Sequence, residues 1–170
     1  MADYGKMTDW ELGRRRQQLV QQMGEVEEAV NKRRAQDRHI MRKDELQWRD
    51  RSEIGMKSKS KTALVVDPII GFNIHNMHAF LAEIAPGSQD GAYHMHGEAI
   101  KYYLSGRGIE IVGDKRYEVQ AGDAVFIPAF TWHGTQNPGP DPLVFLAVTN
   151  NSNPVQKSII FRIREDLKEG

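Results

Sequence analysis

Residues 93–108 read YHMHGEAIKYYLSGRG and carry His94 and His96 one residue apart. In an extended strand, residues two apart point to the same face of the sheet. The two histidines therefore have the spacing of a pair of metal ligands on one strand. Glu98 points the same way if the strand continues, and it points elsewhere if the chain turns at Gly97.

Short segments rich in Val, Ile, Phe and Tyr surround this stretch, and turns with Gly, Pro, Asn or Asp separate them. Many short strands with regular turn signals predict an antiparallel sandwich or small barrel. No helical window interrupts the segments, which excludes a parallel α/β sheet. The expected strands cover residues 63–66, 77–84, 100–104, 108–112, 116–119, 124–127, 143–149 and 158–163.

The N-terminal part has a different composition. Residues 8–54 are rich in Arg, Gln, Glu, Lys and Met and lack proline, which favours helix. Thr8 and Glu11 have the spacing of a capping box at a helix start. A break near residues 31–37 would give two helices or a hairpin. An apolar stripe at helical spacing is expected to pack on the β domain or on a second subunit; it consists of Leu19, Met23, Val26 and Val30.

The polar stretch KSKSK at residues 57–61 predicts a linker. We therefore divide the chain into an N-terminal helical segment at residues 1–57, for packing or oligomerisation, and a β-barrel domain at residues 58–170. Exposed strand edges and the apolar stripe predict a homodimer or a higher homo-oligomer.

Composition excludes several classes of function. The chain has no cysteine, so disulfides, thiolate metal sites and cysteine nucleophiles are excluded. Lys plus Arg and Asp plus Glu number 23 each, so no net charge attracts a nucleic acid. No stretch resembles a signal peptide or approaches the roughly 20 apolar residues of a membrane span. We expect a soluble, cytoplasmic protein without a nucleic-acid or membrane partner.

A second stretch, residues 122–137, reads GDAVFIPAFTWHGTQN and contains a third histidine, His133. Together the two stretches resemble the two motifs of the cupin superfamily over about residues 61–164. The first motif is a glycine, His-x-His, an acidic residue and a closing glycine, and the second is glycine, proline, histidine and asparagine. The matching residues are Gly91, His94, His96, Glu98 and Gly106, and then Gly122, Pro128, His133 and Asn137.

This resemblance implies a double-stranded β-helix, the jelly-roll cupin barrel, with a metal bound inside by His94, His96 and His133. One departure concerns the acidic ligand, which in the commonest cupin form follows the second histidine by four or five residues. This chain has Ile100 and Lys101 there. Glu98 is then a displaced fourth ligand, which we prefer, or a pocket residue, or a turn residue facing solvent.

Neutral imidazoles with at most one carboxylate suit borderline divalent metals. Fe(II) is the expected metal on grounds of reaction class, and Mn, Ni, Cu and Zn are alternatives. The first motif also loosely resembles that of gentisate-type dioxygenases. This implies a non-haem dioxygenase that uses O2 to cleave a ring or C–C bond of a small hydroxylated aromatic compound.

Two other functions fit the same resemblance. One is a metal-dependent isomerase or lyase acting on a small carbonyl compound, with Tyr102 or Glu98 as the catalytic base. The other is a non-catalytic protein that binds a small molecule. Tyr102 lies an even number of residues from the two histidines, so alternation along a strand puts it on their face, and it is expected to face the cavity. Lys101 lies an odd number of residues away and is expected on the opposite face. Other candidates for the cavity wall are Ile100, Leu104, Phe126, Phe130 and Trp132, and His78 is a better candidate for substrate contact than His75.

Overall fold

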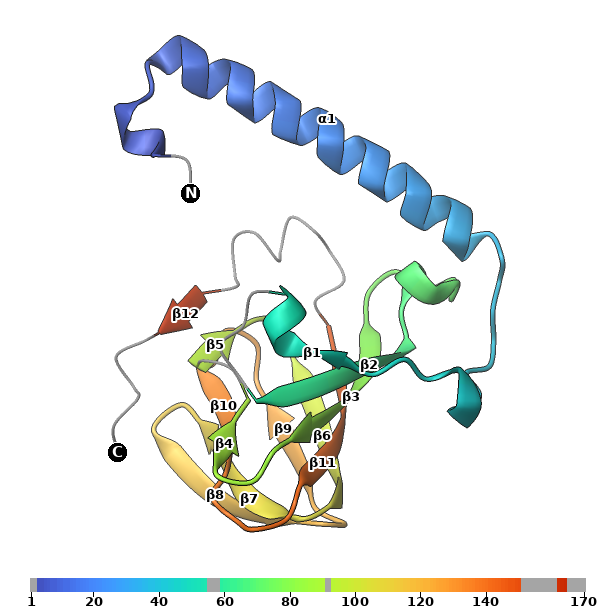
Figure 1. The fold of residues 1–170 in the computed structure, drawn as a ribbon, viewed down its shortest axis with the longest axis vertical. Coiled ribbons are helices and arrows are strands. Elements are labelled where there is room, and N and C mark those ends of the chain that lie inside the picture. The colour runs from blue at the N-terminus through green and yellow to red at the C-terminus, as the bar shows by residue number, and fades with distance from the viewer. Residues whose placement is uncertain (1–2, 55–58, 91–92, 151–161, 165–170) are drawn as a thin grey trace.

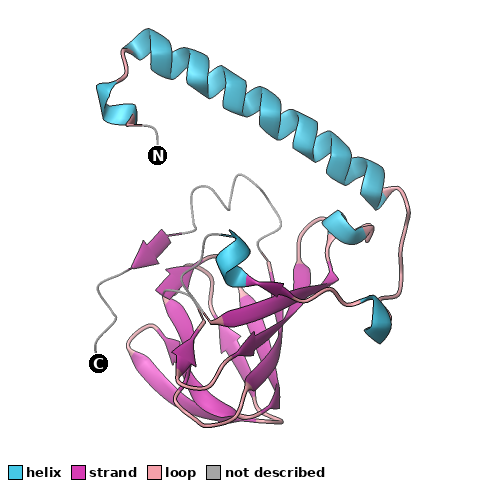
Figure 2. Ribbon diagram, in the orientation of Figure 1, coloured by secondary structure: helices cyan, strands magenta, loops and turns pink. Residues whose placement is uncertain are grey.

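The computed structural model describes residues 3–54, 59–90, 93–150 and 162–164, and Figure 1 draws the others in grey. The described residues form two antiparallel sheets and one long helix (Figure 2). The mainly β fold predicted from the sequence is therefore confirmed, and the two facing sheets are those of a jelly-roll barrel.

The first sheet has the strand order β1-β2-β3-β11-β6-β9, so strands far apart in the chain lie side by side. Burial alternates along β11, because every second residue faces the interior. The strands are β1 (Arg49–Asp50), β2 (Ser60–Val66), β3 (His78–Ile84), β11 (Leu143–Thr149), β6 (Ala99–Ser105) and β9 (Ala124–Ile127).

The second sheet has the order β12-β5-β10-β7-β8, and β4 also pairs with β10. The central β10 therefore brings together segments from three parts of the chain. The expected strand at residues 158–163 lies mostly outside the described residues. The strands are β12 (Arg162–Arg164), β5 (Tyr93–Met95), β10 (His133–Asn137), β7 (Arg107–Val112), β8 (Lys115–Gln120) and β4 (Ser88–Gln89).

Cross-strand register arranges the barrel interior in layers. In the second sheet, His133 pairs with His94 on one side and with Val112 on the other, which defines a histidine layer. Two residues farther along β10, Thr135 pairs with Glu110, which defines a charged layer. Because inward positions recur every second residue, the two layers are neighbours.

The first sheet continues both layers across the barrel. On β11, Thr149 pairs with His78 of β3 and with Ala99 of β6. Two residues earlier on β11, Ala147 pairs with Phe80 and with Lys101. The Lys101 side chain hydrogen-bonds to Glu110 and Thr135, so Ala147 and its paired residues belong to the charged layer. The neighbouring set of paired residues, which includes His78, therefore belongs to the histidine layer. The apolar core starts at Ala147 in the charged layer and continues beyond it; it contains Ala82, Ile84, Tyr103, Val119, Leu143, Phe145 and Ala147.

The helix α1 (Asp9–Arg34) begins at the predicted capping box. The Thr8 N–H donates to the Glu11 carboxylate at 2.8 Å, and the Glu11 N–H donates to Thr8 Oγ1 at 3.3 Å. The helix does not continue to residue 54. It ends at Arg34, and the chain then turns through Asp37, whose φ is 49°.

After this turn, the second predicted helix is replaced by short elements, and that prediction is wrong. Arg38 forms a bridge with Phe72 in the β domain, which holds the segment extended. The short 3-10 helices of the described chain are η1 (Tyr4–Lys6), η2 (Lys43–Glu45), η3 (Arg51–Ile54) and η4 (Pro68–Ile70).

The apolar stripe of α1 does not pack on the barrel. Leu19, Met23 and Val26 are exposed, and no residue of α1 is buried. The helix is held at its C-terminal end, where Arg33 donates to the Ile69 carbonyl at 2.7 Å, and the rest lies away from the sheets (Figure 1). A second subunit as the stripe's partner stays a prediction. No helix in the described chain is long and apolar enough to cross a membrane.

Candidate metal centre

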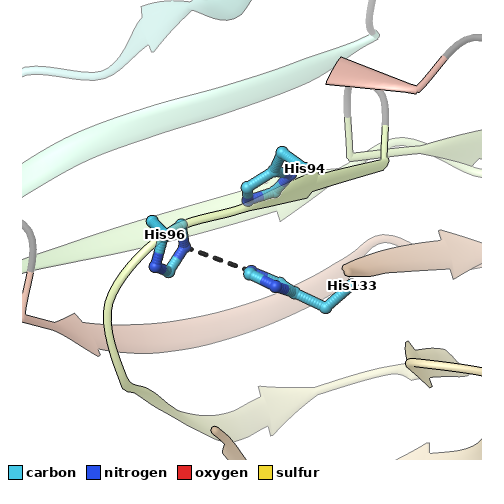
Figure 3. A group of neighbouring side chains, drawn as sticks. All are labelled: His94, His96 and His133. Atoms are coloured by element: carbon cyan, nitrogen blue, oxygen red, sulfur yellow. Dashed lines mark hydrogen bonds between the residues drawn. The ribbon is translucent and has the colours of Figure 1, made fainter. Parts of the chain in front are cut away.

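Three histidines from two neighbouring strands gather in the barrel (Figure 3). β5 carries His94, His96 lies one residue past the end of that strand, and His133 begins β10 opposite His94. Their ligand nitrogens all lie within 4.8 Å of one another. The structure thus brings together the three histidines that the cupin motifs implied as metal ligands.

Backbone carbonyls orient two of the imidazoles. His96 Nδ1 lies 2.8 Å from the Gly97 oxygen, and His133 Nδ1 lies 2.9 Å from the Thr131 oxygen. Donation from Nδ1–H to a carbonyl leaves Nε2 as the ring's lone-pair atom, the usual arrangement for a metal-binding histidine. The two Nε2 atoms lie 3.1 Å apart, and nitrogens bound at right angles to one ion at about 2.1 Å are separated by a similar distance. The donor set therefore fits a divalent metal.

Burial keeps these imidazoles neutral. Desolvation lowers the pKa of His96 below its ordinary value, although the Gly97 carbonyl partly opposes this effect. Desolvation also lowers the pKa of His133 far below its ordinary value, and the charges of His94 and Lys101 act in the same direction. A neutral imidazole is the form that binds a metal, so the site does not need to lose protons first.

Glu98 does not join the three histidines. β5 ends at Met95, and the chain turns at Gly97, where a Cβ atom would collide with the Asn150 carbonyl oxygen. The Glu98 carbonyl accepts a hydrogen bond from the Asn150 N–H at 2.8 Å, while its side chain is exposed. Because the strand does not continue through residue 98, the expected alternation from His96 to Glu98 fails. In the described chain, the group of candidate ligands contains histidines alone.

The same turn also changes which residues of β6 face inward, compared with the sequence-based expectation. Tyr102 is 45% exposed, and Ile100 and Leu104 also point outward, whereas Lys101 and Tyr103 are buried. The prediction that Tyr102 faces the cavity is therefore wrong, and Lys101 takes the inward place. Phe126 and Phe130, expected in the cavity wall, are exposed as well.

A buried ion pair, not predicted from the sequence, lies in the charged layer. Lys101 Nζ donates to Glu110 Oε1 at 2.9 Å and to Thr135 Oγ1 at 2.7 Å. The Tyr103 hydroxyl donates to Glu110 Oε2 at 2.7 Å. Thr135 follows His133 by two residues, so this network lies directly beside the candidate ligands. One feature of the sequence could have indicated this ion pair: Lys101 stands at a position where the commonest cupin form has an acidic ligand.

A second buried ion pair comes from the N-terminal segment. Arg51, the first residue of η3, donates from Nη1 to Asp90, and both side chains are buried. Burial raises the pKa of Asp90, but the positive charges of Arg51, Lys101 and His94 outweigh burial and lower it. The Asp90 carboxylate is therefore ionised and lies close to the histidines. No pattern in the sequence indicated this pair, because residue 51 precedes the predicted β domain.

The wall opposite the three histidines carries His78. Its Nε2 lies 3.0 Å from Thr149 Oγ1, and its Nδ1 lies 3.7 Å from Asp67 Oδ2. His75 is exposed. The structure thus buries His78 and not His75, and a substrate contact by His78 stays a prediction.

The remaining motif residues shape turns. Gly106 and Gly122 adopt φ values of 82° and 95°, which other residues rarely adopt. Asn137 is fully buried and donates to the carbonyls of Ile84 and Asp141 at 2.9 and 2.8 Å. Gly91 lies outside the described residues. Gly106, Gly122 and Asn137 therefore support the fold, whereas the three histidines form the group that could hold a metal ion.

The sequence matches known proteins across this region. Residues 80–149 match the family model described as the cupin domain, a range that contains all three histidines. An uncharacterized protein of Methanocaldococcus jannaschii is 33% identical over 91 residues, which is 51% of this chain and 73% of that protein.

Solved structures show the same fold. A cupin-2 domain protein of Rhodospirillum rubrum superposes with a TM-score of 0.56 at 18% identity, covering 72% of this chain and 85% of that one. The polyketide cyclase RemF of Streptomyces resistomycificus gives 0.56 at 21% identity, covering 69% and 82%. A formate complex of Lactobacillus farciminis oxalate decarboxylase gives 0.50 at 27% identity, covering 59% of this chain and 32% of that one. With its two motifs, its facing sheets and its inward histidines, the chain belongs to the cupin superfamily.

Proposed function

We propose that this cupin is a non-haem Fe(II) dioxygenase that cleaves a ring or C–C bond of a small hydroxylated aromatic compound with O2. The observation that carries the proposal is a ligand group of three imidazoles without a carboxylate. Three protein ligands leave neighbouring coordination positions for a substrate that binds through two oxygens and for O2. Bound iron would supply a Lewis acid and a template on which the electron-rich substrate and O2 meet.

The surrounding residues support an anionic substrate. His96 and His133 are held neutral by burial, so they do not reduce the charge of a divalent ion. The nearby Lys101 and Glu110 neutralise each other. The substrate itself would then supply the compensating negative charge, which favours compounds that bind as phenolates or carboxylates.

A metal-dependent isomerase or lyase is the alternative, and the likeness to the oxalate decarboxylase of Lactobacillus farciminis favours it. An isomerase would need a base that faces the bound substrate. The candidates from the sequence, Tyr102 and Glu98, are both exposed. Their exposure supports the dioxygenase over an isomerase that depends on either of them.

Oxygen uptake tests the proposal. Protein prepared without oxygen and loaded with Fe(II) would be mixed with a panel of dihydroxylated and hydroxy-carboxylated aromatic compounds. One iron per chain with substrate-dependent oxygen consumption supports the dioxygenase, and His133→Ala should abolish both. His39→Ala is the matched control, because His39 is exposed and does not belong to the group. Tight metal binding with no oxygen consumption for any compound would contradict the proposal and favour the alternative.

A further inference from the structure

We propose that two copies of this chain form a dimer through the outer face of the first sheet, at β6, β9 and β11. The inference goes beyond the proposed function, because this face lies on the opposite side of the sheet from the barrel interior. It rests on a part of the sheet that is apolar on its outside. The contact would use neither the strand edges nor the stripe of α1.

The outward positions of β6 and β9 form a continuous apolar surface. Burial alternates along β6, so every second residue points out of the barrel. Cross-strand register places Ile100 of β6 beside Phe126 of β9. The large side chains of this surface are between 45% and 59% exposed, and they are Ile100, Tyr102, Leu104 and Phe126.

The neighbouring strand β11 extends the same face. Leu146 lies beside Tyr102, and the next outward residue, Val148, lies beside Ile100. With Val144, they are the half-buried outward residues of this strand. No charged residue occupies an outward position of β6, β9 or β11. We call this uncharged surface of the three strands the outer face.

A sheet with one side in water normally has polar residues on that side. The second sheet follows this rule, since the outward positions of β8 are Arg116, Glu118 and Gln120. β6 departs from it, because its buried inward residues include Lys101 while its outward residues are apolar. Contiguous exposed apolar surface of this kind marks a site of interaction.

The size of the outer face determines which kind of contact it can form. A large apolar side chain that is half exposed offers on the order of 100 Å², so the outer face offers about 500 Å² per copy. Contact between two copies would then remove about 1,000 Å² from water, which is the lower bound for a specific interface. We therefore expect a dimer that forms reversibly.

A second copy of the chain fits this surface better than other partners do. A surface without charge can meet its own copy without like-charge repulsion, and two sheets pack face to face about 10 Å apart. Nucleic acids and anionic membranes attract Lys and Arg, and the outer face has neither. In a two-fold contact, the central strand β6 of each copy would cross the other, with the two copies of Tyr102 close to the axis.

Sedimentation velocity over a range of protein concentrations tests the proposal. We expect the unmodified protein to change reversibly from monomer to dimer as its concentration rises. Tyr102→Lys puts a charge from each copy at the centre of the contact, and it should weaken the dimer at least about ten-fold, or about 1.4 kcal/mol. Tyr117→Lys is the matched control, because Tyr117 lies on β8 of the second sheet and is also 45% exposed. This control should dimerise like the unmodified protein.

Crosslinking gives a second measurement, which is specific because the chain has no cysteine. Tyr102→Cys should allow a short bifunctional maleimide to join two copies, whereas Tyr117→Cys should not. Adding Phe126→Lys to Tyr102→Cys should reduce the yield of joined copies, because both residues belong to the outer face. Met23→Cys tests the stripe of α1 as the rival contact.

Several results would overturn the proposal. One is a monomer at every concentration, and another is a dimer that both Tyr102→Lys and Phe126→Lys leave unchanged. Crosslinking through Met23→Cys and not through Tyr102→Cys would place the contact on α1 instead. The substituted side chains are exposed, so each variant should melt like the unmodified protein at concentrations where both are monomers.

Discussion

His96 and His133 approach each other through their Nε2 atoms at 3.1 Å, while the Nδ1 atom of each ring lies within 2.9 Å of a backbone carbonyl. With Nδ1–H donating to the carbonyl, both Nε2 lone pairs point at the same space. Two acceptors cannot hydrogen-bond to each other, so a cation between them is the natural partner. The backbone of the two strands thus prepares the site before any metal binds.

His133→Ala should abolish metal binding and leave the barrel folded, because only two of the three imidazoles would remain. A metal that binds only the folded state stabilises it by about 2.7 kcal/mol at a free concentration one hundred times its dissociation constant. We therefore expect Zn(II) to raise the melting temperature of the unmodified protein and not that of the variant. His39→Ala should respond to Zn(II) like the unmodified protein, and an equal response of His133→Ala would refute its role as a ligand.

The stability of the metal-free protein should fall as the pH decreases below about 6.5. Burial lowers the pKa of His96 and His133 in the folded protein. Between the folded and unfolded pKa values, the unfolded chain binds more protons, so acid favours unfolding. Each histidine contributes up to about 1.4 kcal/mol per pH unit in this range. Urea unfolding between pH 8 and 5 measures the slope, which should be smaller in His133→Ala; an unchanged slope would contradict the prediction.

The buried pair of Lys101 and Glu110 should be costly to break from one side. Lys101→Met leaves the Glu110 carboxylate buried without its cation, which typically destabilises a protein by about 3–5 kcal/mol. Adding Glu110→Gln removes the charge, and we expect the double variant to regain much of the lost stability. Lys115→Met, at an exposed position of β8, is the control. Urea unfolding compares the unmodified protein, both single variants, the double variant and the control, and additive effects of the two substitutions would show that the pair is not coupled.

The sequence predicted the barrel and the three histidines because both depend on local patterns. Turn residues recur between short apolar segments, and His94, His96 and His133 occupy motif positions that resemble those of cupins. The residues around the ligands were harder to predict. The turn at Gly97 changes which β6 residues face inward, and no alternation pattern crosses a turn between two sheets. Arg51 enters the barrel through tertiary packing of a segment whose composition indicated helix.

Glu98→Gln and Tyr102→Phe test the revised arrangement most directly. Both side chains are exposed, and the turn at Gly97 separates them from the three histidines. We expect each variant to retain Zn(II) affinity within about two-fold, since neither group is among the ligands and a surface substitution typically changes energies by less than about 0.5 kcal/mol. Chelator competition measures the affinity, with His96→Ala as the variant that should lose it. A ten-fold loss in Glu98→Gln would return Glu98 to the ligand set, and would mean that the turn rearranges when the metal binds.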